Sequence, residues 1–256
     1  MGAALPGDAR SAVSGTQFHA LQGGRRIAFR FTPGAGPALV FLPGYMSDMA
    51  GSKAVAVFAW AEAQGRECLL LDYSGCGESE GDFAGGTLSS WRDEVTALIA
   101  AQCAGPVVVI GSSMGGWLML LVALAAPERV AALVGIAAAP DFTDWGYSAE
   151  QKAQLAAGKT LFEPNPYGPE PTPTYAAFWQ DGQAQQLLGG EIALDCPVRL
   201  LHGQNDSDVP WETALRLAGA LRSGDVQVTL VKDGDHRLSR ERDIAVLLAV
   251  LSDLPR

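Results

Sequence analysis

Ser113 lies at the centre of the pentapeptide Gly-Ser-Ser-Met-Gly, which stands between two apolar segments. Residues 106–110 are rich in valine and isoleucine and predict a buried strand. Residues 116–126 are apolar, contain no proline and predict a helix that ends before Pro127. The pentapeptide alone is also compatible with an ordinary turn. Its place between a strand and a helix favours a nucleophile, because a serine on such a sharp turn exposes its hydroxyl.

A nucleophilic serine needs a base, which is usually a histidine, and the chain has three histidines. His19 lies in an expected N-terminal hairpin, far from the ends of the parallel strands. His202 ends an expected strand, where a structural, hydrogen-bonded role is favoured. His236 follows the expected strand 226–231 in a polar loop that should lie on the same edge of the sheet as Ser113. We therefore predict that His236 is the general base.

Two carboxylates, Asp206 and Asp208, are candidates for the group that orients His236. Both follow the expected strand 198–202. Asp206 comes directly after the strand, whereas Asp208 is placed to cap the next helix near Pro210, which is a common role for aspartate. We therefore predict that Asp206 is the catalytic acid.

Two backbone N–H groups are candidates for an oxyanion hole, which would stabilise negative charge on a reacting carbonyl oxygen. One belongs to Met114, directly after the serine, and the other to Tyr45, after the Pro-Gly turn that follows the expected strand 38–42. Such a donor contributes about 3 kcal/mol to transition-state stabilisation. The Pro-Gly turn alone is also compatible with a plain structural turn.

Strands and helices alternate along most of the chain, which predicts an α/β fold with a mostly parallel sheet and helices on both faces. A hairpin opens the chain, and we expect one domain over residues 1–256. The expected strands span residues 17–20, 26–32, 38–42, 67–72, 106–110, 131–137, 198–202 and 226–231. The expected helices span residues 52–65, 87–101, 116–126, 207–221 and 244–254.

Residues 141–195 interrupt this alternation and hold five prolines and eight of the twenty aromatic residues. An insertion at this point predicts a small lid over the carboxyl edge of the sheet, where open α/β sheets bind ligands. The aromatic side chains could equally form a small core of the insertion itself. The residues that we expect to form an apolar wall above Ser113 and to contact substrate are Trp145, Phe162, Phe178 and Trp179.

Composition excludes several classes of protein. The net charge of −10, from 18 basic and 28 acidic residues, argues against binding to nucleic acid. The longest uncharged apolar runs are about ten residues, too short to span a bilayer. We see no Walker motif, dinucleotide-binding fingerprint or zinc-binding motif, so the sequence implies neither a cofactor nor a metal.

Cysteine spacing and the N-terminus bear on location. The four cysteines lie far apart without a C-x-x-C motif, as is typical of reduced, mostly buried thiols. Residues 1–8 lack a basic region followed by an apolar one, so no secretory signal is expected. These features together predict a cytoplasmic protein.

From about residue 18 to 251 the chain resembles the serine α/β-hydrolase family. The resemblance rests on Ser113 in its turn, on the loop 72–79 (Asp-Tyr-Ser-Gly-Cys-Gly-Glu-Ser), and on the His-Gly-x-x-Asp-x-x-Val-Pro run at 202–210. The chain order of serine, aspartate and histidine is also that of this family. The resemblance implies hydrolysis of a small-molecule carboxylic ester or thioester through an acyl-enzyme on Ser113.

Finer motifs resemble one subgroup, the mitochondrial palmitoyl-protein thioesterase and acyl-glucuronide esterase. They lie at residues 42–45, 111–120, 209–211 and 235–237. A non-catalytic ligand-binding protein on a hydrolase scaffold is the alternative, because fold alone does not determine function. The sequence leaves the oligomeric state, the acyl chain and the leaving group open.

Overall fold

The computed structural model describes residues 15–165 and 168–254. The N-terminal segment in which we expect no secretory signal, and Pro166 and Tyr167 of the insertion, lie outside these ranges. The strands of the main sheet are β1 (Gln17–Ala20), β2 (Arg26–Thr32), β3 (Ala35–Leu42), β4 (Arg66–Leu71), β5 (Val107–Ser112), β6 (Val130–Ile136), β9 (Val198–Gly203) and β10 (Val226–Val231).

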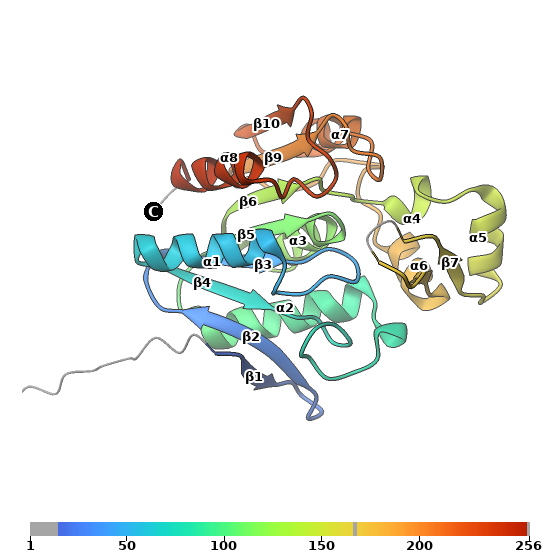
Figure 1. Ribbon diagram of the computed structural model, residues 1–256, viewed down its shortest axis with the longest axis horizontal. Helices are drawn as coiled ribbons and strands as arrows, with labels where there is room; N and C mark the ends of the chain where they lie inside the picture. The colour runs from blue at the N-terminus through green and yellow to red at the C-terminus, as the bar shows by residue number, and fades with distance from the viewer. Residues whose placement is uncertain (1–14, 166–167, 255–256) are drawn as a thin grey trace, which may run out of the picture.

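These strands form one mixed sheet in the order β1-β2-β4-β3-β5-β6-β9-β10 (Figure 1). β1 pairs with β2 in the expected antiparallel hairpin, and β2 is also antiparallel to β4. All the remaining pairs are parallel. The carboxyl ends of β3, β5, β9 and β10 therefore meet at one edge of the sheet, which confirms the mostly parallel architecture predicted from the sequence.

Helices cover both faces of the sheet (Figure 1). Side chains of alternate residues of β3 show this division, because Leu39 and Phe41 pack in one core cluster and Val40 and Leu42 in the other. Strands buried on both faces are continuously apolar, as these are. The cluster with Leu39 and Phe41 includes side chains from α1 (Ser52–Gln64) and α8 (Glu241–Ser252). The other cluster includes side chains from α2 (Leu88–Gln102), α3 (Met114–Ala125) and α7 (Glu212–Ala220).

The insertion has its own secondary structure and lies beside the edge at which the parallel strands end (Figure 1). Its elements are α4 (Phe142–Trp145), α5 (Ala149–Ala156), β7 (Leu161–Glu163), β8 (Thr172–Thr174) and α6 (Ala176–Ala184). β7 and β8 form a separate antiparallel pair. The sequence does not indicate this pair, because each strand has only three residues and β8 contains a proline.

Polar contacts close the insertion on itself and tie it to the rest of the protein. The carboxylate of Asp141 accepts the backbone amides of Leu187 and Leu188 at 2.8 and 2.7 Å, which joins the first residue of the insertion to its far end. Burial raises the pKa of Asp141, although these two amides oppose the shift. In α6, Asp181 accepts the backbone amide and the hydroxyl of Ser89 in α2. The buried ring of Phe178, also in α6, packs in the core cluster of α2 and α3.

Helix α7 begins at Glu212, later than the predicted start at residue 207. The cause is a turn in which Oδ1 of Asp206 accepts the backbone amides of Asp208 and Val209, each at 2.9 Å. Trp211 occupies the N-cap position, and no side chain caps the helix there. The capping role predicted for Asp208 is therefore wrong.

The four cysteines are free. Cys68, Cys76 and Cys103 are buried and Cys196 is half-buried. Burial raises the pKa of Cys76 and of Cys103 to about 12, so these thiols stay protonated and unreactive at neutral pH. Within residues 15–165 and 168–254, no helix is both long enough and apolar enough to cross a membrane.

Candidate active site

Ser113 occupies a strained turn between β5 and α3. Its φ of 54° and ψ of −120° lie in a region that residues with a side chain rarely adopt. Glycines on both sides permit this turn, because a Cβ atom on Gly111 would overlap the backbone of Gly115, and one on Gly115 would overlap the carbonyl of Leu42. The turn therefore depends on close approach of strand and helix, as expected for an exposed nucleophile.

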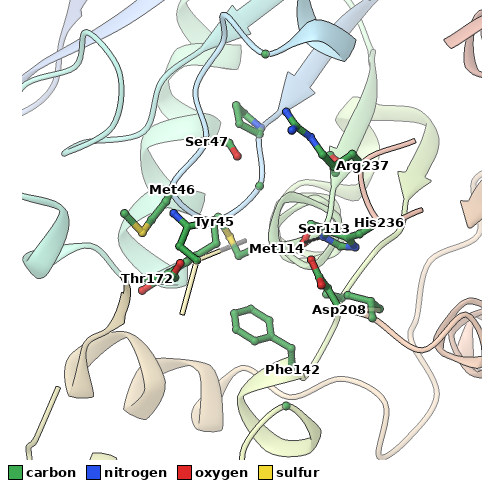
Figure 2. A pocket seen from close by; sticks show the side chains of 18 of the residues that line it. Tyr45, Met46, Ser47, Ser113, Met114, Phe142, Thr172, Asp208, His236 and Arg237 are labelled. Carbon is green, nitrogen blue, oxygen red and sulfur yellow. Dashed lines mark hydrogen bonds between the residues drawn. The ribbon is translucent and has the colours of Figure 1, made fainter. Parts of the chain in front are cut away.

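The three residues predicted for catalysis lie together at the carboxyl edge of the sheet (Figure 2 shows Ser113 and His236). Nε2 of His236 is 3.0 Å from Oγ of Ser113, and Nδ1 of His236 is 2.9 Å from Oδ2 of Asp206. They come from the loops that follow β5, β9 and β10. His236 is 15% exposed at its side chain and Asp206 is 0% exposed, so the contact between them is shielded from water.

Asp206 is held as an anion. Burial alone would raise its pKa, but hydrogen bonds from His202 and His236, the charge of protonated His236 and the Val209 amide hold that pKa well below its ordinary value. An ionised carboxylate facing Nδ1 keeps the hydrogen of His236 on that nitrogen, and this leaves Nε2 to accept a proton. The arrangement can therefore activate the Ser113 hydroxyl.

The two backbone groups predicted for the oxyanion hole border the same cavity as Ser113. Met114 is the first residue of α3, so its N–H has no acceptor within the helix and lies at the positive end of the helix dipole. The turn before Tyr45 lies against the nucleophile, because a Cβ atom on Gly44 would be 3.4 Å from Cβ of Ser113.

The side chain of Tyr45 links this turn to the insertion. Its hydroxyl donates to the carbonyl oxygen of Pro173 in β8 at 2.9 Å. Its ring packs against Phe83 and Phe178, with centroids 5.0 and 4.9 Å away. Burial raises the pKa of Tyr45 far above its ordinary value, so the phenol remains a hydrogen-bond donor.

A cavity of about 750 Å³ lies over Ser113, within the size range of small-molecule sites. One part of its lining is aromatic and comes from α4 and the residues that follow it, namely Phe142, Trp145 and Tyr147. Another part is polar and includes Ser47, Lys53 and Arg237. Figure 2 shows Phe142 across the cavity from Ser47 and Arg237, with Ser113 and His236 at its side. The site thus offers different surroundings to the two ends of a substrate.

The structure separates the four aromatic residues expected to contact substrate. Trp145 lines the cavity, whereas Phe178 is buried outside the lining and packs against Tyr45 and Phe142. The indole N–H of Trp179 donates to the carbonyl of Thr143 at 2.9 Å, inside the insertion. The side chain of Phe162 in β7 is 66% exposed to solvent. The cavity lining instead includes two other aromatic residues of the insertion, Phe142 and Tyr147.

The sequence matches the model of the "Alpha/beta hydrolase family" over residues 39–250. It is 37% identical over 232 residues to the palmitoyl-protein thioesterase ABHD10, mitochondrial, of Homo sapiens, covering 89% of this chain and 76% of that protein. The Mus musculus protein of the same name is 39% identical over 234 residues, covering 89% of this chain and 78% of its own length. These relatives match the subgroup suggested by the sequence motifs.

The relatives also correct one prediction. They are named as mitochondrial proteins, which contradicts the cytoplasmic location that we predicted, so that prediction was wrong. Free, buried thiols indicate a reducing environment without distinguishing between the compartments that provide one. Residues 1–8, in which we expect no secretory signal, lie outside the described structure.

Two solved structures are similar over nearly the whole chain. Alpha/beta hydrolase domain-containing protein 10 from mouse superposes with a TM-score of 0.87 at 36% identity, covering 93% of this chain and 97% of that one. A putative hydrolase from Agrobacterium vitis S4 superposes with a TM-score of 0.88 at 36% identity, covering 94% and 100% of the two chains. The sequence matches and the structural similarity agree, and the chain belongs to the alpha/beta hydrolase family.

Proposed function

We propose that this protein hydrolyses carboxylic esters or thioesters through an acyl-enzyme on Ser113, with His236 and Asp206 as base and acid. The observation that carries the proposal is the continuous chain of hydrogen bonds from Asp206 through His236 to Ser113, at 2.9 and 3.0 Å. The strained backbone of Ser113 supports it, because such strain is maintained where it aims a functional side chain.

The reaction proceeds in two halves. Oγ of Ser113 attacks the carbonyl carbon while Nε2 of His236 takes the hydroxyl proton, and the negative charge on the carbonyl oxygen is held by the N–H groups of Tyr45 and Met114. His236 then gives its proton to the departing alcohol or thiol as the acyl-enzyme forms. Water attacks that acyl-enzyme with His236 again as base, and the acid is released with Ser113 restored.

Acyl thioesters are the substrate class that we propose first, because the curated relatives are named palmitoyl-protein thioesterases. The aromatic part of the cavity, with Phe142, Trp145 and Tyr147, offers an apolar surface to the acyl group. The leaving group would then lie toward the polar part, which contains Lys53 and Arg237. The cavity thereby distinguishes the two halves of the substrate by polarity.

Serine variants test this proposal. Ser113→Ala should abolish both thioester hydrolysis and labelling by a fluorophosphonate probe, because no hydroxyl remains for the acyl group. The matched control is Ser112→Ala, which changes the neighbouring serine at the end of β5 and should retain much of both activities. Acyl thioesters and the corresponding oxygen esters should be compared in parallel. Probe labelling that survives in a folded Ser113→Ala protein would rule out Ser113 as the nucleophile.

A further inference from the structure

The carboxylate of Asp206 contacts two histidines. Its Oδ2 atom is 2.9 Å from Nδ1 of His236 and 3.1 Å from Nε2 of His202. Its other oxygen, Oδ1, accepts the backbone amides of Asp208 and Val209. The side chains of Asp206 and His202 are both 0% exposed. The contact with His202 therefore places an imidazole nitrogen beside the carboxylate in a site without solvent, where polar interactions with a charged group are strong, and it contributes to the lowered pKa of Asp206.

The surroundings of His202 determine which ring nitrogen carries the hydrogen. Nε2 lies 3.1 Å from the carbonyl oxygen of Val209 as well as 3.1 Å from Asp206. A carbonyl and a carboxylate only accept hydrogen bonds, so Nε2 must be the donor. Nδ1 is buried and has no hydrogen-bond partner among the residues that the structure describes. The neutral ring that fits this site is the Nε2–H tautomer, whose hydrogen lies between two acceptors, the carbonyl of Val209 and the carboxylate of Asp206.

The sheet holds His202 in place. The residue lies in β9, with Leu230 of β10 as its register partner, and β10 leads into the loop of His236. Asp206 lies three residues after the end of β9. Both histidines that contact the carboxylate are thus attached to two paired parallel strands, so their spacing is set by backbone hydrogen bonds.

We propose that His202 is a positioning residue for the catalytic acid, whose Nε2–H fixes Oδ2 of Asp206 in front of His236 and shares its negative charge. This inference rests on the proposed function of Ser113, Asp206 and His236. A carboxylate that accepts a second hydrogen bond stabilises a protonated His236 less strongly. His202 therefore also changes how strongly the charge of Asp206 acts on His236.

A test of His202 must leave the other charged residues near His236 unchanged. Those that line the cavity in the described part of the chain are Asp48, Lys53, Glu163, Asp208 and Arg237. Burial, with a contribution from Arg237, lowers the pKa of Lys53 to about 8. The variants below change none of these residues, so differences between variants report on His202.

The test compares His202→Leu, which removes the donor, with His202→Gln, whose amide can return an N–H to the position of Nε2. For His202→Leu we expect kcat/KM to fall about tenfold, as for weakening of one hydrogen bond to a charged group. We also expect the midpoint of the acid limb of its pH profile to rise by about half a unit or more. His202→Gln should return both quantities toward those of the unchanged protein.

The control for packing is Leu201→Ala, a buried neighbour in β9 that belongs to the core cluster on the opposite face of the sheet. It should lower the melting temperature without moving the pH midpoint. A folded His202→Leu protein with unchanged kcat/KM and an unchanged midpoint would overturn the role of His202. Retained hydrolysis in Ser113→Ala would instead overturn the proposed function, so the two failures are distinguishable.

A measurement on the unchanged protein covers the case in which His202→Leu does not fold. The chain has three histidines, so imidazole ¹⁵N signals can be assigned one by one. We expect the Nε2–H tautomer for His202 and a shift of its Nε2 resonance in Asp206→Asn. An Nδ1–H tautomer, or an Nε2 resonance that ignores Asp206→Asn, would overturn the inference.

Discussion

The loops that carry the catalytic residues and the insertion of residues 141–195 are held by different interactions. Ser113 directly follows β5, and Asp206 and His236 follow β9 and β10 after short loops, so the register of the sheet constrains their separation. The insertion is attached through individual side chains, such as Asp181, which is bonded to Ser89, and Phe178, which packs against Tyr45. The reacting groups therefore depend on the whole sheet, whereas the wall facing the substrate can be altered one contact at a time.

The first way to test this contrast is to remove the charge of the catalytic acid. Asp206→Asn should lower kcat by about 10⁴-fold, as when the acid of a serine triad becomes an amide, because His236 then loses its tautomer. Asp208→Asn is the matched control, since Asp208 lies two residues away and it is Oδ2 of Asp206 that is bonded to Nδ1 of His236. Steady-state kinetics on a thioester substrate will measure both. A larger loss for Asp208→Asn would transfer the acid role to it.

A second comparison uses glycine positions in the two regions. Gly115→Ala would force a Cβ atom into the carbonyl oxygens of Leu42 and Pro43 and should lower the free energy of unfolding by about 3 kcal/mol. Gly190 in the insertion has nothing within 4 Å of its Cβ position. Gly190→Ala should be neutral or stabilising by about 0.5 kcal/mol. Urea unfolding midpoints will measure the stability of both variants. Equal losses of stability would contradict the tighter packing that we describe around Gly115.

A third test addresses the wall of the cavity. Trp145→Ala should lower kcat/KM for longer acyl thioesters by about fourfold for each methylene that loses contact, or about 0.8 kcal/mol each, and leave acetyl thioesters nearly unchanged. Phe162→Ala is the control in the same insertion, because that side chain is exposed and outside the cavity. If acyl length has the same effect on both variants, Trp145 does not contact the acyl group.

The smallest expected effect is on how the free energy of unfolding depends on pH. The pKa of Asp206 is lowered in the folded protein, whereas the pKa of Asp141 is raised. The lowered pKa of Asp206 means that its ionisation stabilises the fold above its ordinary pKa of about 4, and that this contribution is lost as the pH falls. The raised pKa of Asp141 means that its contribution to stability is greatest at low pH. This contribution declines as the pH rises above the ordinary aspartate pKa of about 4.

The effects of Asp206→Asn and Asp141→Asn on the free energy of unfolding should therefore change in opposite directions between pH 3 and 6. The destabilisation caused by Asp206→Asn should shrink toward low pH, whereas that caused by Asp141→Asn should grow. Parallel trends would show that the two carboxylates do not differ in this way.

Most of the sheet and the order of the site residues could be predicted from the sequence. Ser113, Asp206 and His236 each follow an apolar strand, and parallel strands bring such positions to one edge. The start of α7 could not be predicted, because the turn before it depends on a side-chain contact of Asp206 with two backbone amides. Propensity and spacing do not encode such contacts.

The insertion was harder to predict for a different reason. Phe178 and Trp179 are adjacent on α6, so they point in different directions, and aromatic composition alone does not say which direction faces the substrate. Trp145 and Phe162 are equally apolar in the sequence, yet one lines the cavity and the other is exposed. Only the placement of α4 and β7 in the folded insertion distinguishes them.

The hydrogen bond from Tyr45 to Pro173 has a consequence for chimaeric proteins. Exchanging residues 141–195 for the insertion of a relative would have to supply a carbonyl oxygen where Pro173 now provides one. Without it, the buried hydroxyl of Tyr45 would be left unpaired at a cost of about 1–3 kcal/mol. This loss would destabilise the turn whose N–H we propose as an oxyanion donor. The insertion and the turn at Tyr45 should therefore be transplanted together, as one exchangeable unit.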